Sequence, residues 1–278
     1  MSRLEDALAA GQFVVTGELP VVDGGGMEQV RHHVGLIKDW VDAANATDNT
    51  AAHAHASNTA VAIAMQQLGL EPILQIVCRD KNRLAAQADV VGAALHGIQN
   101  IACLTGDDVT AGDEPETRRV FDLDSTQLIN VVRGLAEGHY LSGRPLQPAP
   151  HLFIGAVENP AAPPIDYRVD RSLKKARAGA RFLQLQICYH PDLLEGFLAG
   201  AVQSGLTQRT AILPSVCMTG SPKALRYIDA NVPGISIPHG LIDEIERAAD
   251  PGEACFELAV QQAEHARSLP GVAGLHLI

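Results

Sequence analysis

Short apolar runs alternate with longer amphipathic stretches along the whole of this chain. Each run has a length typical of a buried strand, and its residues are mostly apolar or β-branched. We expect eight strands, at Phe13–Glu18, Val41–Thr47, Pro72–Cys78, Asn100–Thr105, His151–Val157, Arg181–Ile187, Thr210–Val216 and Ala273–Ile278. Helical spacing of apolar residues predicts helices between them, at Met27–Trp40, Thr50–Leu68, Asn82–His96, Ser125–Glu137, Arg168–Ala178, Pro191–Gln203, Pro222–Asp229 and Glu253–Leu269.

This alternation of strand and helix determines the expected fold class. Strands connected through helices lie parallel and are joined by right-handed crossovers. Eight such units in 278 residues fit a closed (β/α)8 TIM barrel better than an open doubly wound sheet. We therefore predict a single parallel eight-stranded barrel domain over residues 1–278, in which 46% of the residues are apolar.

Charge and cysteine usage narrow the class of partner. The net charge is −11 and no run of Lys or Arg is present, which argues against binding nucleic acid or an anionic membrane surface. The five cysteines are widely spaced and lie mostly in apolar runs, which is not typical of a disulfide framework. No apolar stretch has the length of a membrane span. We expect a cytoplasmic protein that binds a small molecule.

Acids and amides gather at the predicted carboxyl ends of the strands, which form the functional face of such a barrel. No Ser or Cys is paired with a His there, which gives acyl transfer little support. No strand ends in a lysine that could form a Schiff base. The residues at these ends are Glu18, Thr47, Asp48, Arg79, Asp80, Thr105, Gly106, Asp107, Glu158, Asn159 and Gln186.

Two of these side chains have more than one interpretation. Glu18 follows an apolar strand, and burial favours the protonated form of such a carboxyl, so it is suited to donate a proton; it could equally be a solvated charge or a helix-capping ion. Gln184 and Gln186 alternate with apolar residues and so point to the same face of their strand. An amide there suits the edge of a heterocycle, or it is a hydrogen-bonded core residue.

His53 and His55 are the candidates for metal binding. We expect them on a helix, where a spacing of two residues points them to different sides. Neither a cysteine pair nor a His-Glu-x-x-His motif accompanies them, so we predict no metal site.

Several segments, taken in order, resemble the methylenetetrahydrofolate reductase family over essentially the whole chain. The most specific part is the ordered series Cys78–Leu84, Gly97–Ile101, Leu104–Asp107 and Val120–Ser125. The other matching segments are Gly17–Pro20, Asn45–Asn49, Gly155–Pro160, and Lys175 followed by Ala178–Ala180 and Gln186.

The resemblance implies a (β/α)8 barrel that carries FAD and reduces 5,10-methylenetetrahydrofolate to 5-methyltetrahydrofolate, with NADH or NADPH as electron donor. Glu18 would donate the proton that opens the ring at N10, leaving an iminium that accepts hydride from flavin N5. Asp107 would bind the pterin and modulate the flavin, and Gln186 would hydrogen-bond the pterin. The positions that the resemblance assigns to FAD are Thr47, Gln75, Thr105, Gly106, Phe121, Asp122, Asn159 and Lys175.

The sequence also departs from the family pattern. Gln75 stands where many members have a flavin-contacting histidine, and Asn159 lies where many have a tyrosine. Two alternatives therefore stay open, a flavin-independent pterin reductase and a non-catalytic folate-binding subunit of a larger one-carbon complex. The expected partner is a tetrahydrofolate derivative, and both a homo-oligomer and a partner subunit remain open.

Overall fold

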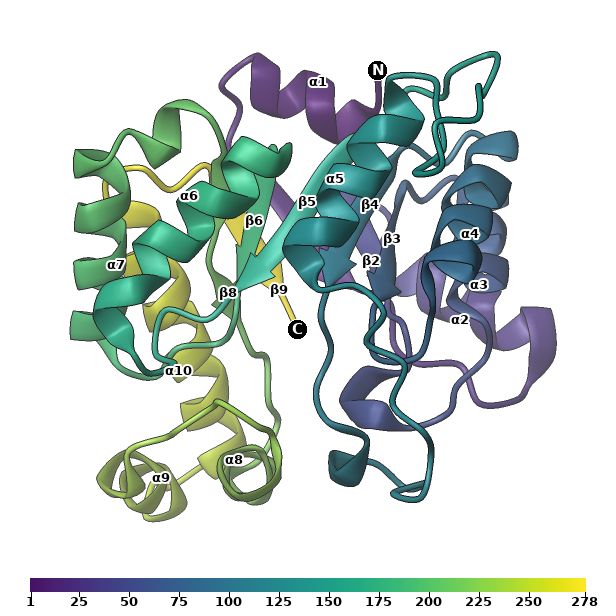
Figure 1. Cartoon of the computed structure of the whole chain (residues 1–278). Coiled ribbons are helices and arrows are strands. Elements are labelled where there is room, and N and C mark those ends of the chain that lie inside the picture. Colours follow the sequence, from purple (N-terminus) through teal and green to yellow (C-terminus); the bar gives the residue numbers. More distant parts are fainter.

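The predicted strands pair into one parallel sheet that curves into a barrel (Figure 1). The computed structural model describes residues 1–278. Neighbouring strands follow in the order β7-β6-β5-β4-β3-β2-β1-β9-β8. Their bounds are β1 Val14–Glu18, β2 Ala43–Ala46, β3 Pro72–Val77, β4 Asn100–Leu104, β5 Phe153–Glu158, β6 Phe182–Leu185, β7 Ala211–Leu213, β8 Ser215–Val216 and β9 Gly274–Leu277.

The barrel closes through a divided strand. The run expected at Thr210–Val216 is split at Pro214 into β7, which pairs with β6, and β8, which pairs with β9. Proline has no N–H to donate to a sheet, so it interrupts the pairing at this position. A single parallel bridge between Ile212 and Val272 links β7 to the segment before β9. The (β/α)8 TIM-type barrel expected from the sequence is confirmed, with its seventh strand in two pieces.

Helices cover the outside of the barrel, and five of the ten begin at a residue whose side chain caps the helix. Asp124 and Gln127 form a capping box at the start of α5, and the Asn82 side chain accepts hydrogen bonds from the backbone at the start of α4. The bounds are α1 Arg3–Ala9, α2 Gly26–Ile37, α3 Asn58–Gln67, α4 Arg83–Leu95, α5 Ser125–Ala136, α6 Arg168–Ala178, α7 Pro191–Gln203, α8 Pro222–Asn231, α9 His239–Glu246 and α10 Pro251–Ser268.

One helix prediction is wrong over part of its length. The segment expected to be a helix from Thr50 begins with a short 3-10 turn at Thr50–Ala52, and α3 begins only at Asn58. Asn49, Ala51 and Ala52 have positive φ angles, which a continuing helix does not allow. His53 and His55 therefore lie in a loop, and the helical argument about their spacing does not apply.

The barrel interior is built in layers because alternate residues of each strand point inward. An apolar layer at the amino-terminal end contains Val14, Ile73, Phe153 and Phe182, and Leu4 of α1 packs against it. Gly155 leaves room for the Phe182 ring, since a Cβ on Gly155 would lie 2.1 Å from it. A second core between strands and helices contains 42 buried residues. The next inward layer is polar and leads to the opposite end of the barrel.

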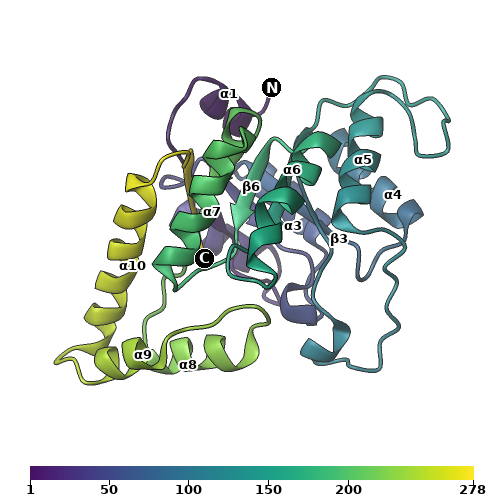
Figure 2. The same ribbon diagram turned by 60° about the vertical axis from the view of Figure 1, so that its left-hand side comes forward.

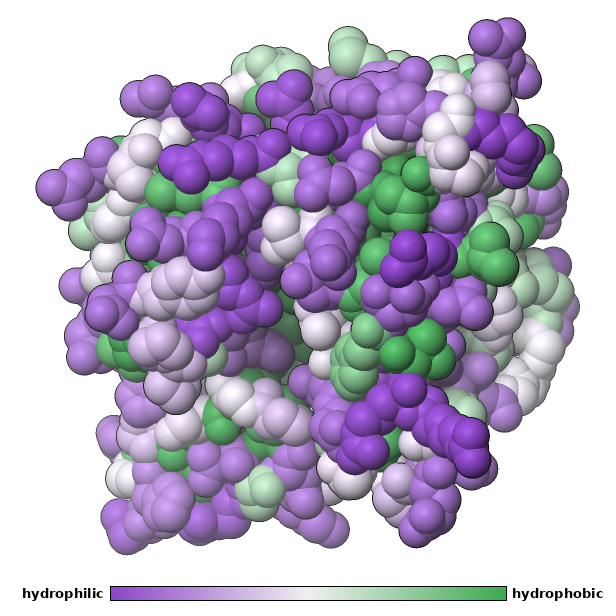
Figure 3. Space-filling model, in the orientation of Figure 1, coloured by the Kyte–Doolittle hydropathy of each residue, from purple (hydrophilic) through white to green (hydrophobic).

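The two ends of the barrel differ. Helix α1 lies across one end, while α8, α9 and the loop after β4 lie at the other (Figures 1 and 2). Hydrophilic residues cover most of the face shown in Figure 3, and the surface is hollowed near its centre. None of the helices combines the length and the apolar character needed to cross a membrane.

Candidate functional site

A cavity of about 470 Å³ opens at the carboxyl ends of the strands. Residues from all eight strand positions of the barrel line it, together with the loop that follows α8. Of the eleven residues that the sequence assigns to substrate or cofactor, eight line this cavity: Glu18, Gln75, Thr105, Gly106, Asp107, Asn159, Lys175 and Gln186. The strand order therefore brings together residues that are as far as 168 positions apart in the chain, as the barrel prediction required.

Glu18 ends β1 and faces the cavity with 25% of its side chain exposed. It does not cap a helix, because the following helix α2 has Gly25 at its N-cap. Its only ion-pair contact is with His276, whose Nε2 lies 3.7 Å from Glu18 Oε1. The carboxyl is thus accessible to a ligand and has no lysine or arginine partner.

A layer of buried polar side chains lies beneath Glu18. Thr16, Asn45, Gln184 and His276 come from four different strands and are each at most 2% exposed. Asn45 and Gln184 exchange two amide hydrogen bonds of 3.1 and 3.0 Å. The Nδ1 atom of His276 lies 2.9 Å from Thr16 Oγ1. Gln184 is therefore a hydrogen-bonded core residue, and Gln186, two positions further on the same face, reaches the cavity.

Asp107 lies in the cavity wall after β4. Partial desolvation raises the pKa of its carboxyl, and the nearby Arg79 guanidinium opposes that shift. Two residues before it, Thr105 accepts a hydrogen bond of 3.1 Å from the backbone N–H of Ser125, at the first turn of α5. Gly106 has a φ of +92°, and a Cβ there would lie 2.5 Å from Val77. The glycine is required by the packing of the chain itself.

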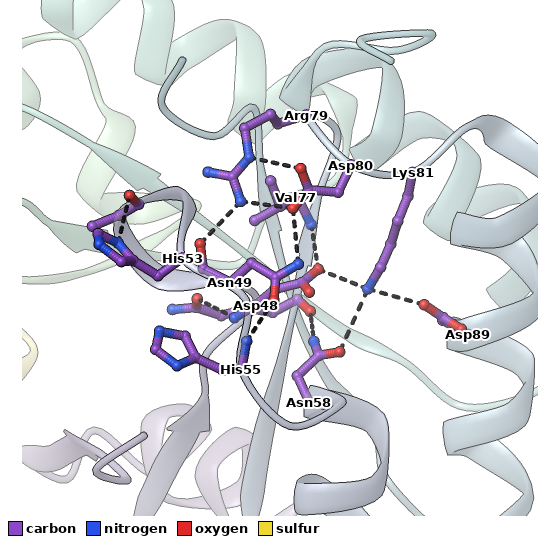
Figure 4. A network of polar contacts seen from close by, with 12 residues as sticks. Asp48, Asn49, His53, His55, Asn58, Val77, Arg79, Asp80, Lys81 and Asp89 are labelled. Carbon is purple, nitrogen blue, oxygen red and sulfur yellow. Dashed lines mark hydrogen bonds and ion pairs between the residues drawn. The ribbon is translucent and has the colours of Figure 1, made fainter. Parts of the chain in front are cut away.

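A network of charged groups supports the loop after β2 (Figure 4), and its Arg79 lies near Asp107. Asp48 accepts hydrogen bonds from the Val77 backbone N–H at 2.9 Å and from Lys81 Nζ at 2.7 Å. Burial raises the pKa of Asp48 although Lys81 opposes the shift. Arg79 forms two hydrogen bonds with Asp80 and one with the Asn49 carbonyl. These contacts hold the loop that forms this wall of the cavity.

His53 and His55 lie at the outer edge of this network (Figure 4). His55 Nδ1 contacts Asp23 Oδ1 at 2.5 Å, and His53 Nδ1 contacts the Ala51 carbonyl at 3.0 Å. No three His, Cys, Asp or Glu side chains are arranged to hold a metal ion.

Three basic side chains of α6 surround one buried carboxylate on the opposite wall. Glu158 has no exposed side-chain surface and lies 3.0 Å from Lys175 Nζ, 3.4 Å from Arg168 Nη1 and 3.5 Å from Arg171 Nη1. Burial lowers the pKa of Lys175, and Glu158 opposes that shift. One carboxylate cannot neutralise three cations, so this wall carries excess positive charge. Arg171, whose side chain is 38% exposed, is the member most open to an anionic ligand.

The amide side chains proposed for the site differ in which of their groups are already hydrogen-bonded within the protein. Gln186 Oε1 accepts a hydrogen bond of 3.0 Å from the Ile187 backbone, which leaves its NH2 group available. Asn159 Nδ2 donates at 2.7 Å to the carbonyl of Gly234, in the loop that follows α8. Gln75 Oε1 accepts at 3.4 Å from the Asp48 backbone. Asn159 therefore connects the two sides of the cavity mouth.

Three residues proposed from the sequence do not line the main cavity. Thr47 lines a smaller pocket with Leu19, Val22 and His55. Phe121 has a positive φ of 37°, and its backbone N–H donates to the Cys78 carbonyl. Asp122 accepts two side-chain hydrogen bonds of 2.8 Å from Arg83. In this structure Asp122 holds the start of α4.

His276, Asn45 and Arg171 line the cavity although the sequence did not predict them as site residues. Alternation along the strands could have indicated His276 and Asn45, because inward-facing positions recur at every second residue. His276 also pairs with Thr16 in the register of the sheet. Arg171 gave no such signal, since its place on the cavity wall depends on the packing of α6 against β5.

The fold and the site together define a TIM-type barrel with an acid- and amide-lined cavity at the carboxyl ends of its strands. The family model described as methylenetetrahydrofolate reductase matches residues 3–278, and the chain belongs to this family. No curated protein sequence matches the chain.

Solved structures of low sequence identity share the fold. A Clostridium thermocellum protein described as binding two copies of 5-methyl-5,6,7,8-tetrahydrofolic acid has a TM-score of 0.65 at 13% identity, covering 99% of this chain and 92% of that chain. Oxaloacetate acetylhydrolase, with the inhibitor 3,3-difluorooxalacetate, has a TM-score of 0.52 at 9% identity, covering 99% and 78%. A putative phosphonomutase from Burkholderia cenocepacia J2315 has a TM-score of 0.50 at 12% identity, covering 100% and 92%.

Proposed function

We propose that this protein binds a reduced folate in the main cavity and reduces 5,10-methylenetetrahydrofolate to 5-methyltetrahydrofolate. Family membership over residues 3–278 supports a folate-related activity. The Clostridium thermocellum protein of the same fold binds 5-methyltetrahydrofolic acid, the product of this reaction. The observation that carries the proposal is the Glu18 carboxyl, which faces the cavity without a lysine or arginine partner.

Glu18 acts in this proposal as the general acid. Opening the five-membered ring breaks the bond between N10 and the methylene carbon, and N10 takes the proton from the Glu18 carboxyl. A carboxyl paired with a fixed cation would remain ionised and could not supply that proton. Asp107 and the free NH2 group of Gln186 line the same cavity and supply an acceptor and a donor for the edge of the pterin.

FAD is the proposed hydride carrier, and the side chains present fit its chemistry. The excess positive charge of Arg171 and Lys175 beside Glu158 suits a diphosphate, while Gln75, Thr105 and Asn159 offer polar contacts to a ring. When bound, the flavin would supply the hydride to the methylene carbon. We propose NADH or NADPH as the source of its electrons.

Two observations favour a second candidate, a folate-binding protein or pterin reductase without flavin. Lys175 Nζ already contacts the Val157 carbonyl at 2.5 Å and Glu158 at 3.0 Å. Phe121 and Asp122, matched to the nucleotide part of FAD, do not line the cavity, and Asp122 is held by Arg83.

A single set of measurements separates these candidates. The purified protein is incubated with FAD, desalted and examined for the absorption bands of bound flavin, and 5-methyltetrahydrofolate binding is measured by titration calorimetry. Turnover is then measured with 5,10-methylenetetrahydrofolate and either NADH or NADPH. We expect flavin bands, folate binding and formation of 5-methyltetrahydrofolate.

The other outcomes are equally distinct. Turnover without flavin bands would replace the flavin-dependent reaction by direct reduction from the nicotinamide. Folate binding without turnover under any of these conditions would leave the non-catalytic subunit. Absence of folate binding would contradict the proposed function altogether.

A further inference from the structure

The buried polar layer beneath Glu18 contains a histidine that the proposed function has not used. His276 is 2% exposed, and its ring lies among Thr16, Asn45 and Gln184. Buried polar groups of this kind need every donor matched to an acceptor. The pairing of donors with acceptors therefore determines which ring nitrogen of His276 carries the proton.

Asn45 and Gln184 each donate one amide N–H to the oxygen of the other, and each has a second N–H to donate elsewhere. Asn45 Nδ2 directs its second hydrogen to His276 Nε2 at 3.2 Å. Gln184 Nε2 lies 3.2 Å from His276 Nδ1 and 3.3 Å from Thr16 Oγ1, and its second hydrogen is donated to Thr16 when Nδ1 carries the ring proton. Nε2 of His276 is then an acceptor, so the ring proton is on Nδ1 and is donated to Thr16 Oγ1 at 2.9 Å. The Thr16 hydroxyl donates in turn to the Leu275 carbonyl at 3.3 Å.

The reverse orientation of both amides leaves this region without enough donors. The amide oxygen of Gln184, the Nδ1 atom of His276 and the Leu275 carbonyl would then all require the single hydroxyl hydrogen of Thr16. With both amides reversed, an imidazolium would supply the missing hydrogens, but each amide would then have a second N–H without an acceptor among these groups, because each amide oxygen has a single hydrogen-bond contact here. The orientation with a neutral, Nδ1-protonated His276 is therefore the one that gives every donor an acceptor.

This arrangement determines what His276 presents to Glu18. An imidazolium would direct an N–H at the amide N–H of Asn45, which the network opposes. A neutral ring places its Nε2 lone pair 3.7 Å from Glu18 Oε1 and supplies no counter-charge. On the elements around the ring, Glu18 of β1 is the charged group in contact, and Cys217 after β8 is the other titratable group near Glu18. Burial raises the pKa of the Cys217 thiol to about 11, so it is uncharged near neutral pH.

We propose that His276 is a positioning residue that the Asn45–Gln184 amide pair keeps neutral, so that it places no counter-cation beside Glu18 that would favour the ionised form over the protonated form that the reaction consumes. This inference rests on the proposed function for its consequence, but the protonation state of His276 does not depend on that function. His276 itself exchanges no proton with the substrate.

The first test is the protonation state of His276 in the wild-type protein. Nitrogen chemical shifts of 15N-histidine-labelled protein distinguish the two neutral tautomers from the imidazolium, and His276→Gln identifies the signals. We expect the neutral Nδ1–H tautomer at pH 7. An imidazolium or an Nε2–H tautomer would overturn the inference and leave the proposed function untouched.

The second test introduces an acceptor beside Nε2. Asn45→Asp replaces the amide N–H by a carboxylate oxygen, which stabilises the imidazolium and so gives Glu18 a counter-cation. We expect an imidazolium signal at pH 7 and an alkaline limb of the folate-reduction rate that moves about one to three pH units lower. Asn130→Asp, on the exposed surface of α5, makes the same change of charge and should alter neither readout.

The two readouts keep the two claims apart. An imidazolium in Asn45→Asp with an unmoved pH profile would overturn the link between His276 and Glu18. Failure of the wild-type protein to reduce the folate would contradict the proposed function, while the wild-type nitrogen spectrum would still decide the state of His276. Because that spectrum is recorded without Asn45→Asp, poor folding of this variant does not prevent the test.

Discussion

Glu158 shows how strongly one residue of the cavity wall depends on its partners. Its side chain is completely buried, and Arg168, Arg171 and Lys175 all lie within 3.5 Å of it. A buried charge is tolerated only where its partners offset the loss of hydration. The carboxylate therefore stabilises the cavity wall as well as shaping its charge.

Removal of this carboxylate is expected to destabilise the protein. Glu158→Gln leaves the cations of α6 close together without their shared partner, at a cost of about 3 kcal/mol in the free energy of unfolding. Urea unfolding checks this value. Glu28→Gln, on the exposed side of α2, should change the free energy by no more than about 0.5 kcal/mol, and an equal effect of both substitutions would contradict this view of Glu158.

Asp122 gives a prediction about pH. Arg83 lowers the pKa of Asp122 to about 2 through side-chain and backbone hydrogen bonds, against an unfolded-state value of about 3.9. A carboxyl with a lowered folded-state pKa stabilises the fold above the unfolded-state value, and this contribution is lost as pH falls toward the folded-state value.

Asp122→Asn should therefore lower the thermal unfolding midpoint at pH 7. The difference from the wild type should shrink as pH falls from about 4 toward 2. Thermal unfolding of both proteins over this pH range checks the trend. A difference that stays constant with pH would show that Asp122 acts by some other means than its charge.

The residues on the inward face of single strands could be predicted from the sequence, and those brought in by packing could not. Glu18, Gln184 and Gln186 follow an alternation that is local to their strands. The contact of Lys175 with Glu158 depends on how α6 packs against the end of β5, and the contact of Asp122 with Arg83 depends on how the loop before α5 meets the start of α4. No local pattern in the chain specifies that geometry.

Element prediction succeeded where the periodicity was long and failed where a few residues decided the conformation. The short helix α1 and the helix α9 were not expected, because each offers two turns or so of pattern. The alanine-rich segment after Asn49 has helical composition, yet its positive φ angles postpone the start of α3. Pro214 divides one expected strand into β7 and β8, and the apolar residues of this run did not predict the division.

Gly155 allows a test of the barrel interior at the level of its strands. A methyl group at this position of β5 would overlap the Phe182 ring of β6, which stacks on Phe153 with ring centroids 5.2 Å apart. Gly155→Ala should lower the free energy of unfolding by about 1–3 kcal/mol through overpacking.

The matched substitution Gly92→Ala lies in α4, where a Cβ would meet no atom within 4 Å. It should raise the free energy of unfolding by about 0.5–1 kcal/mol, because alanine favours a helix over glycine. Urea unfolding compares the two. If Gly155→Ala were as stable as Gly92→Ala, the interior would not be packed as described.

The fold buries or partly buries all five cysteine thiols. The five cysteines are unpaired, and burial raises the pKa of Cys78 to about 12 and that of Cys103 well above its usual value. We expect native protein at pH 8 to react slowly with a thiol-specific reagent and all five thiols to react after unfolding. Rapid labelling of Cys78 or Cys103 in the native protein, located by peptide mass spectrometry, would contradict this.

At the scale of the molecule, the apolar layer covered by α1 and the candidate functional cavity lie at opposite ends of the barrel. Leu4 of α1 packs against the apolar layer at one end, and Glu18, Asp107 and Gln186 line the cavity at the other. This separation allows Glu18, Asp107 and Gln186 to be exchanged with little effect on the apolar layer. The proposed reaction depends on one of them, Glu18, as its proposed proton donor.

The most direct measurement is the rate of each half-reaction in Glu18→Gln, followed by stopped flow in the FAD-reconstituted protein. We predict flavin reduction by the nicotinamide at nearly the wild-type rate and reduction of 5,10-methylenetetrahydrofolate slower by about 10²–10⁴-fold, since only the second step consumes the proton. A parallel loss in both half-reactions, or an unchanged folate step, would contradict the role assigned to Glu18.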